Sequence, residues 1–178
     1  MTELDVLRIV SERLTARGLP FMLTGSFALA YYATPRMTRD IDIVVALTSA
    51  DTAGLVAVFA PDFYIDADAV RDALAIEGLF NMMHLESGIK VDLIVRRADE
   101  YRRVEFERRT RVTFASIQTW IVSREDLMLS KLVWARAGAS ELQLRDVHAL
   151  KTESMDAAYL RHWAGVLGIG SMLEQVLA

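Results

Sequence analysis

The hydrophobic pattern changes its period once along this chain, and that change constrains the fold most. Before residue 123, short β-branched and apolar runs alternate with amphipathic segments. The strands expected there are residues 21–24, 40–47, 80–85, 89–95, 111–114 and 119–122. From Ser123 onward the segments have helical spacing. The sequence therefore predicts an α/β (α+β) fold, in which a small mixed sheet is flanked by helices and followed by a C-terminal helical part.

The same change suggests how the chain is organised. We expect residues 1–122 to form a sheet-bearing core and residues 123–178 to form a helical subdomain packed on it. A length of 178 residues fits a single domain, and a hydrophobic content of 53% excludes an intrinsically disordered chain. The sequence has neither a signal-peptide pattern nor an apolar run long enough to span a membrane. A cytoplasmic protein with no membrane partner is expected.

Cysteine content and charge exclude further classes. The chain has no cysteine, which excludes disulfides and thiolate metal sites. Its net charge of -4 argues against binding nucleic acid through the whole surface, because such binding normally uses a basic protein. One local exception is the arginine-rich segment, residues 96–111. Two interpretations of it remain: a solvated helix face with ion pairs, or a contact site for nucleic acid.

Acidic side chains at alternate strand positions are the first candidates for chemistry. Asp40 and Asp42 are two residues apart in an expected strand, so both project from one face of the sheet. A second expected strand carries Asp92. If the two strands are neighbours, the three carboxylates converge, and they need a cation between them. Hard oxygen ligands suit Mg²⁺ or Mn²⁺, and such a site can hold a nucleoside triphosphate (NTP).

A glycine–serine pair forms the second candidate feature. Gly25 and Ser26 follow the apolar run Phe21–Thr24 and precede a short helical segment. Glycine permits a tight turn, and the free N–H groups of a helix N-terminus can bind phosphate. Alone, either feature has a plainer explanation, because Asp-x-Asp often marks a strand edge and Gly-Ser is common in turns. Their order and spacing together favour a site.

At these residues the sequence resembles the nucleotidyltransferase superfamily with the polymerase-β-like fold. It is most similar there to the toxin-type nucleotidyltransferases of abortive-infection and type IV toxin–antitoxin systems. The resemblance covers about residues 19–150 and is carried by Thr24-Gly25-Ser26-Phe27-Ala28-Leu29, Arg36-Met37-Thr38-Arg39-Asp40-Ile41-Asp42, Val91-Asp92-Leu93, Glu125-Asp126-Leu127-x-x-x-Lys131-Leu132 and Arg145-Asp146. The resemblance implies that residues 1–122 are the catalytic core.

The resemblance also implies roles at the matching positions near the acidic pair. Gly25 and Ser26 would hold the triphosphate of an NTP. Asp40 and Asp42 would bind Mg²⁺ or Mn²⁺. Asp92 would complete the metal site and help to deprotonate the acceptor hydroxyl.

Four further residues lie in the segments that carry the resemblance. Lys131 would reach the triphosphate from the helical part, although a lysine whose stem lies along an amphipathic helix is the alternative. Asp146 matches an acid near the active site in toxin-like members. Arg36 and Arg39 would contact phosphate or balance the local acids. The tryptophans are instead expected in the core: Trp120, Trp134 and Trp163.

The activity implied is transfer of a nucleoside monophosphate from an NTP to a hydroxyl of a tRNA or a protein, with release of pyrophosphate and a cognate antitoxin as partner. Two alternatives share the fold: a small antibiotic-modifying nucleotidyltransferase with a small-molecule acceptor, and a catalytically silent antitoxin-like binding module. A third is an aspartate-nucleophile phosphohydrolase. In that class the apolar run precedes Asp-x-Asp, whereas here it follows Asp42, which argues against it.

Overall fold

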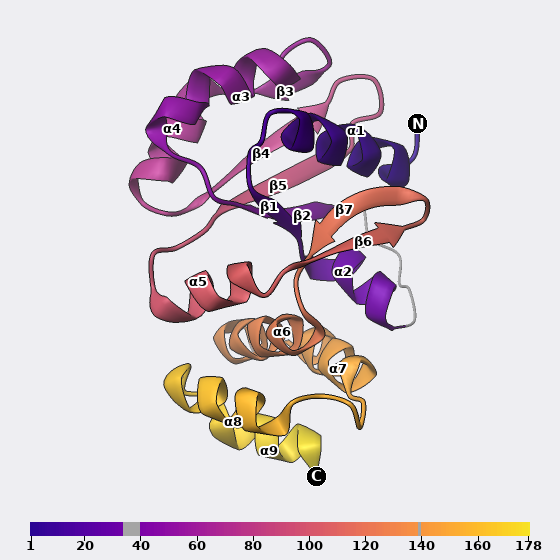
Figure 1. The fold of residues 1–178 in the computed structure, drawn as a ribbon, viewed down its shortest axis with the longest axis vertical. Coiled ribbons are helices and arrows are strands. Elements are labelled where there is room, and N and C mark those ends of the chain that lie inside the picture. The colour runs from indigo at the N-terminus through magenta and orange to yellow at the C-terminus, as the bar shows by residue number, and fades with distance from the viewer. Residues whose placement is uncertain (34–39, 139) are drawn as a thin grey trace.

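A computed structural model describes residues 1–33, 40–138 and 140–178 of the chain. Its centre is one sheet with the strand order β3-β4-β5-β2-β1-β7-β6 (Figure 1). The strands are β1 (Phe21–Leu23), β2 (Ile41–Val45), β3 (Phe63–Ile65), β4 (Leu79–His84), β5 (Lys90–Val95), β6 (Thr110–Phe114) and β7 (Ile117–Ile121). Parallel pairing joins β2 to β5 and β1 to β7, and the other pairs are antiparallel. The predicted mixed sheet and α/β fold are confirmed.

Helices cover both faces of the sheet. Those described are α1 (Glu3–Ala16), α2 (Gly25–Tyr32), α3 (Thr52–Phe59), α4 (Ala67–Ala75), α5 (Glu100–Glu107), α6 (Arg124–Gly138), α7 (Glu141–Leu150), α8 (Ala157–Val166) and α9 (Gly170–Leu177), and a 3₁₀ turn, η1 (Ser49–Asp51), precedes α3. Helices α1, α3 and α4 lie on one side, and α2, α5 and α6 lie on the other (Figure 1). No described helix is long and apolar enough to span a membrane.

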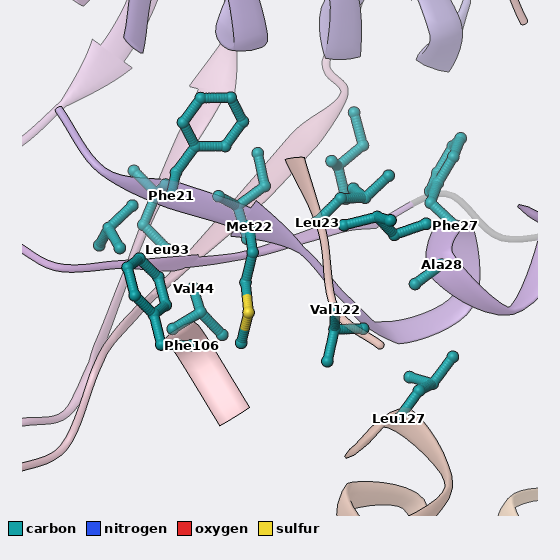
Figure 2. Packing of buried hydrophobic residues seen from close by; sticks show 14 of the residues in the cluster. Phe21, Met22, Leu23, Phe27, Ala28, Val44, Leu93, Phe106, Val122 and Leu127 are labelled. Carbon is teal, nitrogen blue, oxygen red and sulfur yellow. The ribbon is translucent and has the colours of Figure 1, made fainter. Parts of the chain in front are cut away.

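The alternation of side chains along the central strands builds the two layers of the core. Phe21 points toward α1, whereas Met22 points to the opposite face with Val44 and Phe106 (Figure 2). All three residues of β1 are fully or almost fully buried, as expected for a strand with neighbours on both edges and helices on both faces. Residues of β2 divide in the same way, so Asp42 shares the face of Val44. That face is the one toward α2, α5 and α6.

The four described helices after β7 lie on the side of α2 and α5, away from α1 (Figure 1). Helix α6 lies next to α2, and α8 and α9 are the outermost pair. An ion pair between Arg108 and the fully buried Asp126, 3.0 Å, joins the end of α5 to the start of α6. The division of the chain into a core, residues 1–122, and a helical subdomain, residues 123–178, remains a prediction.

The arginine-rich segment is only in part the solvated helix face with ion pairs that one interpretation proposed. Arg102 donates to the buried Glu105 and to Ser130 of α6, at 2.8–2.9 Å and 2.7 Å. Arg109 lies over the ring of Phe106, 4.1 Å from its centroid. Together with Arg108, these arginines attach α5 to its neighbours, so most of the segment's basic character is used inside the protein. Arg97, Arg103 and Arg111 remain exposed.

Candidate active site

The parallel pairing of β2 with β5 brings two acidic side chains together. Asp42 is the direct register partner of Asp92, so their side chains leave the same face of adjacent strands. Asp40 precedes β2 by one residue on the same face, and its side chain is 53% exposed. The strands that carry the predicted acids are therefore neighbours, as the convergence of three carboxylates requires.

The protonation behaviour of Asp42 reflects this crowding. Burial, and then the neighbouring carboxylates of Asp92 and Asp40, raise the pKa of Asp42 to about 6. The ammonium groups of Lys131 and Lys90 act in the opposite direction, but they do not compensate fully. The charged form of Asp42 is thus disfavoured, and an added cation would stabilise it.

The donor set fits a hard divalent cation. Asp92 Oδ1 is buried and has no hydrogen-bond partner among the described residues, so one carboxylate oxygen is available as a ligand. Oxygen donors of this kind are those that Mg²⁺ and Mn²⁺ prefer. Within residues 1–33, 40–138 and 140–178, no three histidine or acidic side chains are grouped as a ready metal cluster. The assignment of Asp40, Asp42 and Asp92 as metal ligands therefore stays a prediction.

Gly25 starts α2 directly against the acidic pair. Its φ of +62° is a left-handed conformation that favours glycine. A Cβ at this position would lie 2.0 Å from Asp42 Oδ2. The backbone of the strand–helix turn is therefore in contact with the carboxylate, and Thr24 N–H donates to the Asp42 carbonyl at 2.9 Å. Ser26 lies in the first turn of α2 and is 8% exposed.

Replacing Gly25 by alanine is expected to disrupt this contact. The new methyl group would push the Asp42 carboxylate away, and alanine at a positive φ adds backbone strain, so we expect a loss of about 1–3 kcal/mol of stability. Urea unfolding of the purified variant measures it. Gly88→Ala is a matched control, because Gly88 has a φ of +68° but nothing within 4 Å of an added Cβ. Equal losses in the two variants would contradict a specific clash with Asp42.

A buried ion pair connects the helical part to the same site. Lys131 of α6 donates to Asp146 of α7 at 2.7 Å, and the two side chains are 3% and 5% exposed. Lys131 also donates to Gln143 Oε1 at 3.2 Å. Its positive charge reaches Asp42, where it lowers the pKa. Both late residues named from the sequence thus lie in one buried pair beside the acidic cluster, and Lys131 is not a lysine whose head lies in solvent.

A cavity of about 390 Å³ opens between the sheet and α6. One end is formed by Thr24, Gly25 and Lys131. Its apolar walls come from Val44, Ile94, Leu127, Val133 and Trp134, with Arg96, Arg97 and Arg102 among the charged lining residues. The expectation that all three tryptophans lie in the core is wrong for Trp134, whose side chain is 43% exposed. Trp163 is buried as expected.

Two predicted phosphate contacts, Arg36 and Arg39, lie outside the described residues. Two residues near the site were not anticipated. Lys90 contacts the acidic cluster, and Trp134 lines the cavity. The position of Lys90 could have been predicted, because it is two residues before Asp92 and so lies on the same face of the strand. The exposure of Trp134 depends on how α6 is rotated, which helical periodicity alone did not determine.

The comparisons with known proteins agree with this architecture. The family model described as "Nucleotidyl transferase AbiEii toxin, Type IV TA system" matches residues 9–164. No curated protein matches the sequence.

Among solved structures, the chain is similar to an antigenic nucleotidyltransferase-like protein from Paracoccidioides brasiliensis, with a TM-score of 0.58, 15% identity, and coverage of 97% of this chain and 90% of that one. It is also similar to the antibiotic-resistance factor ANT(2'')-Ia, with a TM-score of 0.62, 14% identity, and coverage of 96% and 93%. A third is the lincosamide antibiotic adenylyltransferase LnuA, with a TM-score of 0.55, 13% identity, and coverage of 85% and 98%. At these identities the likeness concerns the fold.

The family match extends from α1 to α8 and includes both acidic strands, the Gly25 turn and the Lys131–Asp146 pair. The fold shared with the solved nucleotidyltransferase structures is the one found here. This protein is a nucleotidyltransferase and belongs to the AbiEii family of type IV toxin–antitoxin systems.

Proposed function

We propose that this protein transfers a nucleoside monophosphate from an NTP to a hydroxyl of a tRNA or a protein. The observation that carries the proposal is the contact between the Gly25 turn and Asp42, beside Asp92. It joins a backbone suited to phosphate with carboxylates suited to a cation, so a triphosphate and Mg²⁺ or Mn²⁺ can bind side by side. Toxin-like activity, with a cognate antitoxin as partner, follows from the family.

In this proposal the residues of the chain have distinct tasks. The N–H groups at the start of α2, with Ser26, and the ammonium of Lys131 bind the triphosphate. Asp42 and Asp40 would hold the cation, and Asp92 would complete its ligands. When bound, the cation would neutralise phosphate charge and favour ionisation of the acceptor hydroxyl.

The reaction then needs an in-line attack. The acceptor oxygen forms a bond to the α-phosphorus while the bond from that phosphorus to the bridging oxygen of pyrophosphate breaks. In this step Asp92 accepts the hydroxyl proton. Pyrophosphate leaves with its charge balanced by Lys131 and the N-terminus of α2. The cavity beside Gly25 and Lys131 is proposed for the nucleoside.

A small-molecule acceptor is the second candidate. Two observations favour it: a structure similar in fold is of a lincosamide antibiotic adenylyltransferase bound to lincomycin, and another is of ANT(2")-Ia with adenylyl-2"-tobramycin. This chain covers 98% and 94% of those two chains, so its size matches theirs. The two candidates differ only in the acceptor and share the triphosphate site.

The test is a labelling experiment with the full chain, Mg²⁺ and each α-labelled NTP. Parallel reactions contain total tRNA, a protein extract, or lincosamides and aminoglycosides. We expect label in the tRNA or the protein fraction, and label on the antibiotics would favour the second candidate. The doubly substituted Asp40→Asn/Asp42→Asn protein should give none, whereas Asp72→Asn, an exposed position on α4, should label like the unchanged protein. Equal labelling by the Asp40/Asp42 variant would overturn the proposed site.

A further inference from the structure

Lys90 stands inside the acidic cluster. It lies two residues before Asp92 on the same face of β5, as Asp40 lies two residues before Asp42. Its Nζ is 2.9 Å from Asp92 Oδ2 and 3.7 Å from Asp40 Oδ1. The hydrogen bond to Asp92 raises the pKa of Lys90, so the ammonium stays charged. One cation supplied by the chain thus bridges two of the three carboxylates.

An ammonium in that position and a divalent cation compete for the same carboxylate. Asp92 Oδ2 accepts a hydrogen bond from Lys90 Nζ, and two cations a few ångströms apart repel each other. The side chain of Lys90 can turn into solvent, because it is 41% exposed and its four-carbon stem is flexible. Asp92 is held more firmly, since its side chain is only 14% exposed.

We propose that Lys90 is a built-in competitor for the metal: its ammonium neutralises Asp40 and Asp92 in the metal-free protein and leaves Asp92 when a divalent cation binds. This inference depends on the metal assignment within the proposed function. Lys90 then has two effects. It reduces the repulsion between carboxylates in the metal-free protein, and it raises the metal concentration that is needed to fill the site. The lysine is a positioning residue here, because it acts through the carboxylates.

The test measures Mn²⁺ binding without any NTP, by calorimetry and by electron paramagnetic resonance of free Mn²⁺, together with the thermal midpoint of the metal-free protein. For Lys90→Gln we expect Mn²⁺ to bind about fivefold more tightly, the scale of losing one partly exposed ion pair, and the metal-free midpoint to fall. Lys90→Arg keeps the charge and should bind Mn²⁺ like the unchanged protein. Lys151→Gln controls for the loss of one positive charge far from the site, since its Nζ bonds the Leu177 carbonyl.

Equal or weaker Mn²⁺ binding by Lys90→Gln overturns the inference, because a competitor's removal has to tighten binding. So does the absence of Mn²⁺ binding in both proteins. Failure of the proposed function would be seen separately. If Lys90→Gln binds Mn²⁺ more tightly but the unchanged protein transfers no label from any NTP, the competition is supported and only the proposed transfer reaction is contradicted.

Discussion

Replacing Asp42 by asparagine is expected to lower nucleotidyl transfer by about 10²–10³-fold and, at neutral pH, to make the protein more stable. The loss of activity follows because asparagine keeps the shape of the side chain but removes the charge that attracts the cation. The gain in stability follows because folding disfavours the charged form of Asp42, whose pKa is raised to about 6. A steady-state labelling assay and urea unfolding of the same preparation measure the two effects.

The pH dependence gives the sign of the stability change. The pKa of Asp42 rises on folding from 3.8 to about 6, so the folded chain binds this proton more tightly than the unfolded chain does. Stability from this proton is full below pH 3.8 and is lost as the pH rises through about 6. At pH 7.5 the asparagine variant should therefore be more stable, by about 3 kcal/mol, and the difference should shrink at pH 5.

Asp62 supplies the control of opposite sign. Its pKa is lowered, mainly by the hydrogen bond from Arg13, so its charge contributes stability that is present above its ordinary pKa and lost as the pH falls. Asp62→Asn should make the protein less stable at pH 7.5. A loss of stability in Asp42→Asn at the same pH would contradict this prediction. It would mean that the folded protein stabilises the charged form of Asp42, despite the nearby carboxylates of Asp92 and Asp40.

Local patterns predicted most of the elements. The alternation of β-branched and polar residues around Asp42 and Asp92 marked β2 and β5, and helical spacing marked the four helices after β7. What local patterns could not supply was the register of two strands about 50 residues apart, which makes Asp42 and Asp92 exact partners. Register depends on which side chains the whole sheet buries. The acids could be named as candidates, but their contact could not be deduced.

Two segments were missed or displaced for identifiable reasons. Strand β3 has only three residues, too few for alternation to show. Strand β7 begins at Ile117, two residues before the expected start, because a tight turn is made by Ala115 and Ser116 at φ values of 47° and 63°. Such turns usually use glycine or asparagine, so Ala115 and Ser116 do not indicate a turn by residue type. The tertiary pairing of β6 with β7 stabilises a turn that these residues would not form alone.

The second large effect is expected at the buried pair of α6 and α7. Lys131→Met should cost about 3–5 kcal/mol of stability, because it leaves the carboxylate of Asp146 buried without its ammonium partner. Methionine has a similar length and is apolar, so packing is largely kept. Urea unfolding measures the cost. Arg161→Met is the matched control: its ion pair with Glu174 is at the surface, and its loss should leave the free energy of unfolding nearly unchanged.

The double variant Lys131→Met/Asp146→Leu separates the structural task of this lysine from its proposed contact with phosphate. Replacing both members of a buried ion pair by apolar side chains is often close to neutral, so much of the lost stability should return. Nucleotidyl transfer should not return, because the restored fold still lacks the ammonium of Lys131 at the cavity that Gly25 lines. Recovery of both properties would show that Lys131 only holds α6 against α7. Recovery of stability alone would support the proposed contact of Lys131 with the triphosphate.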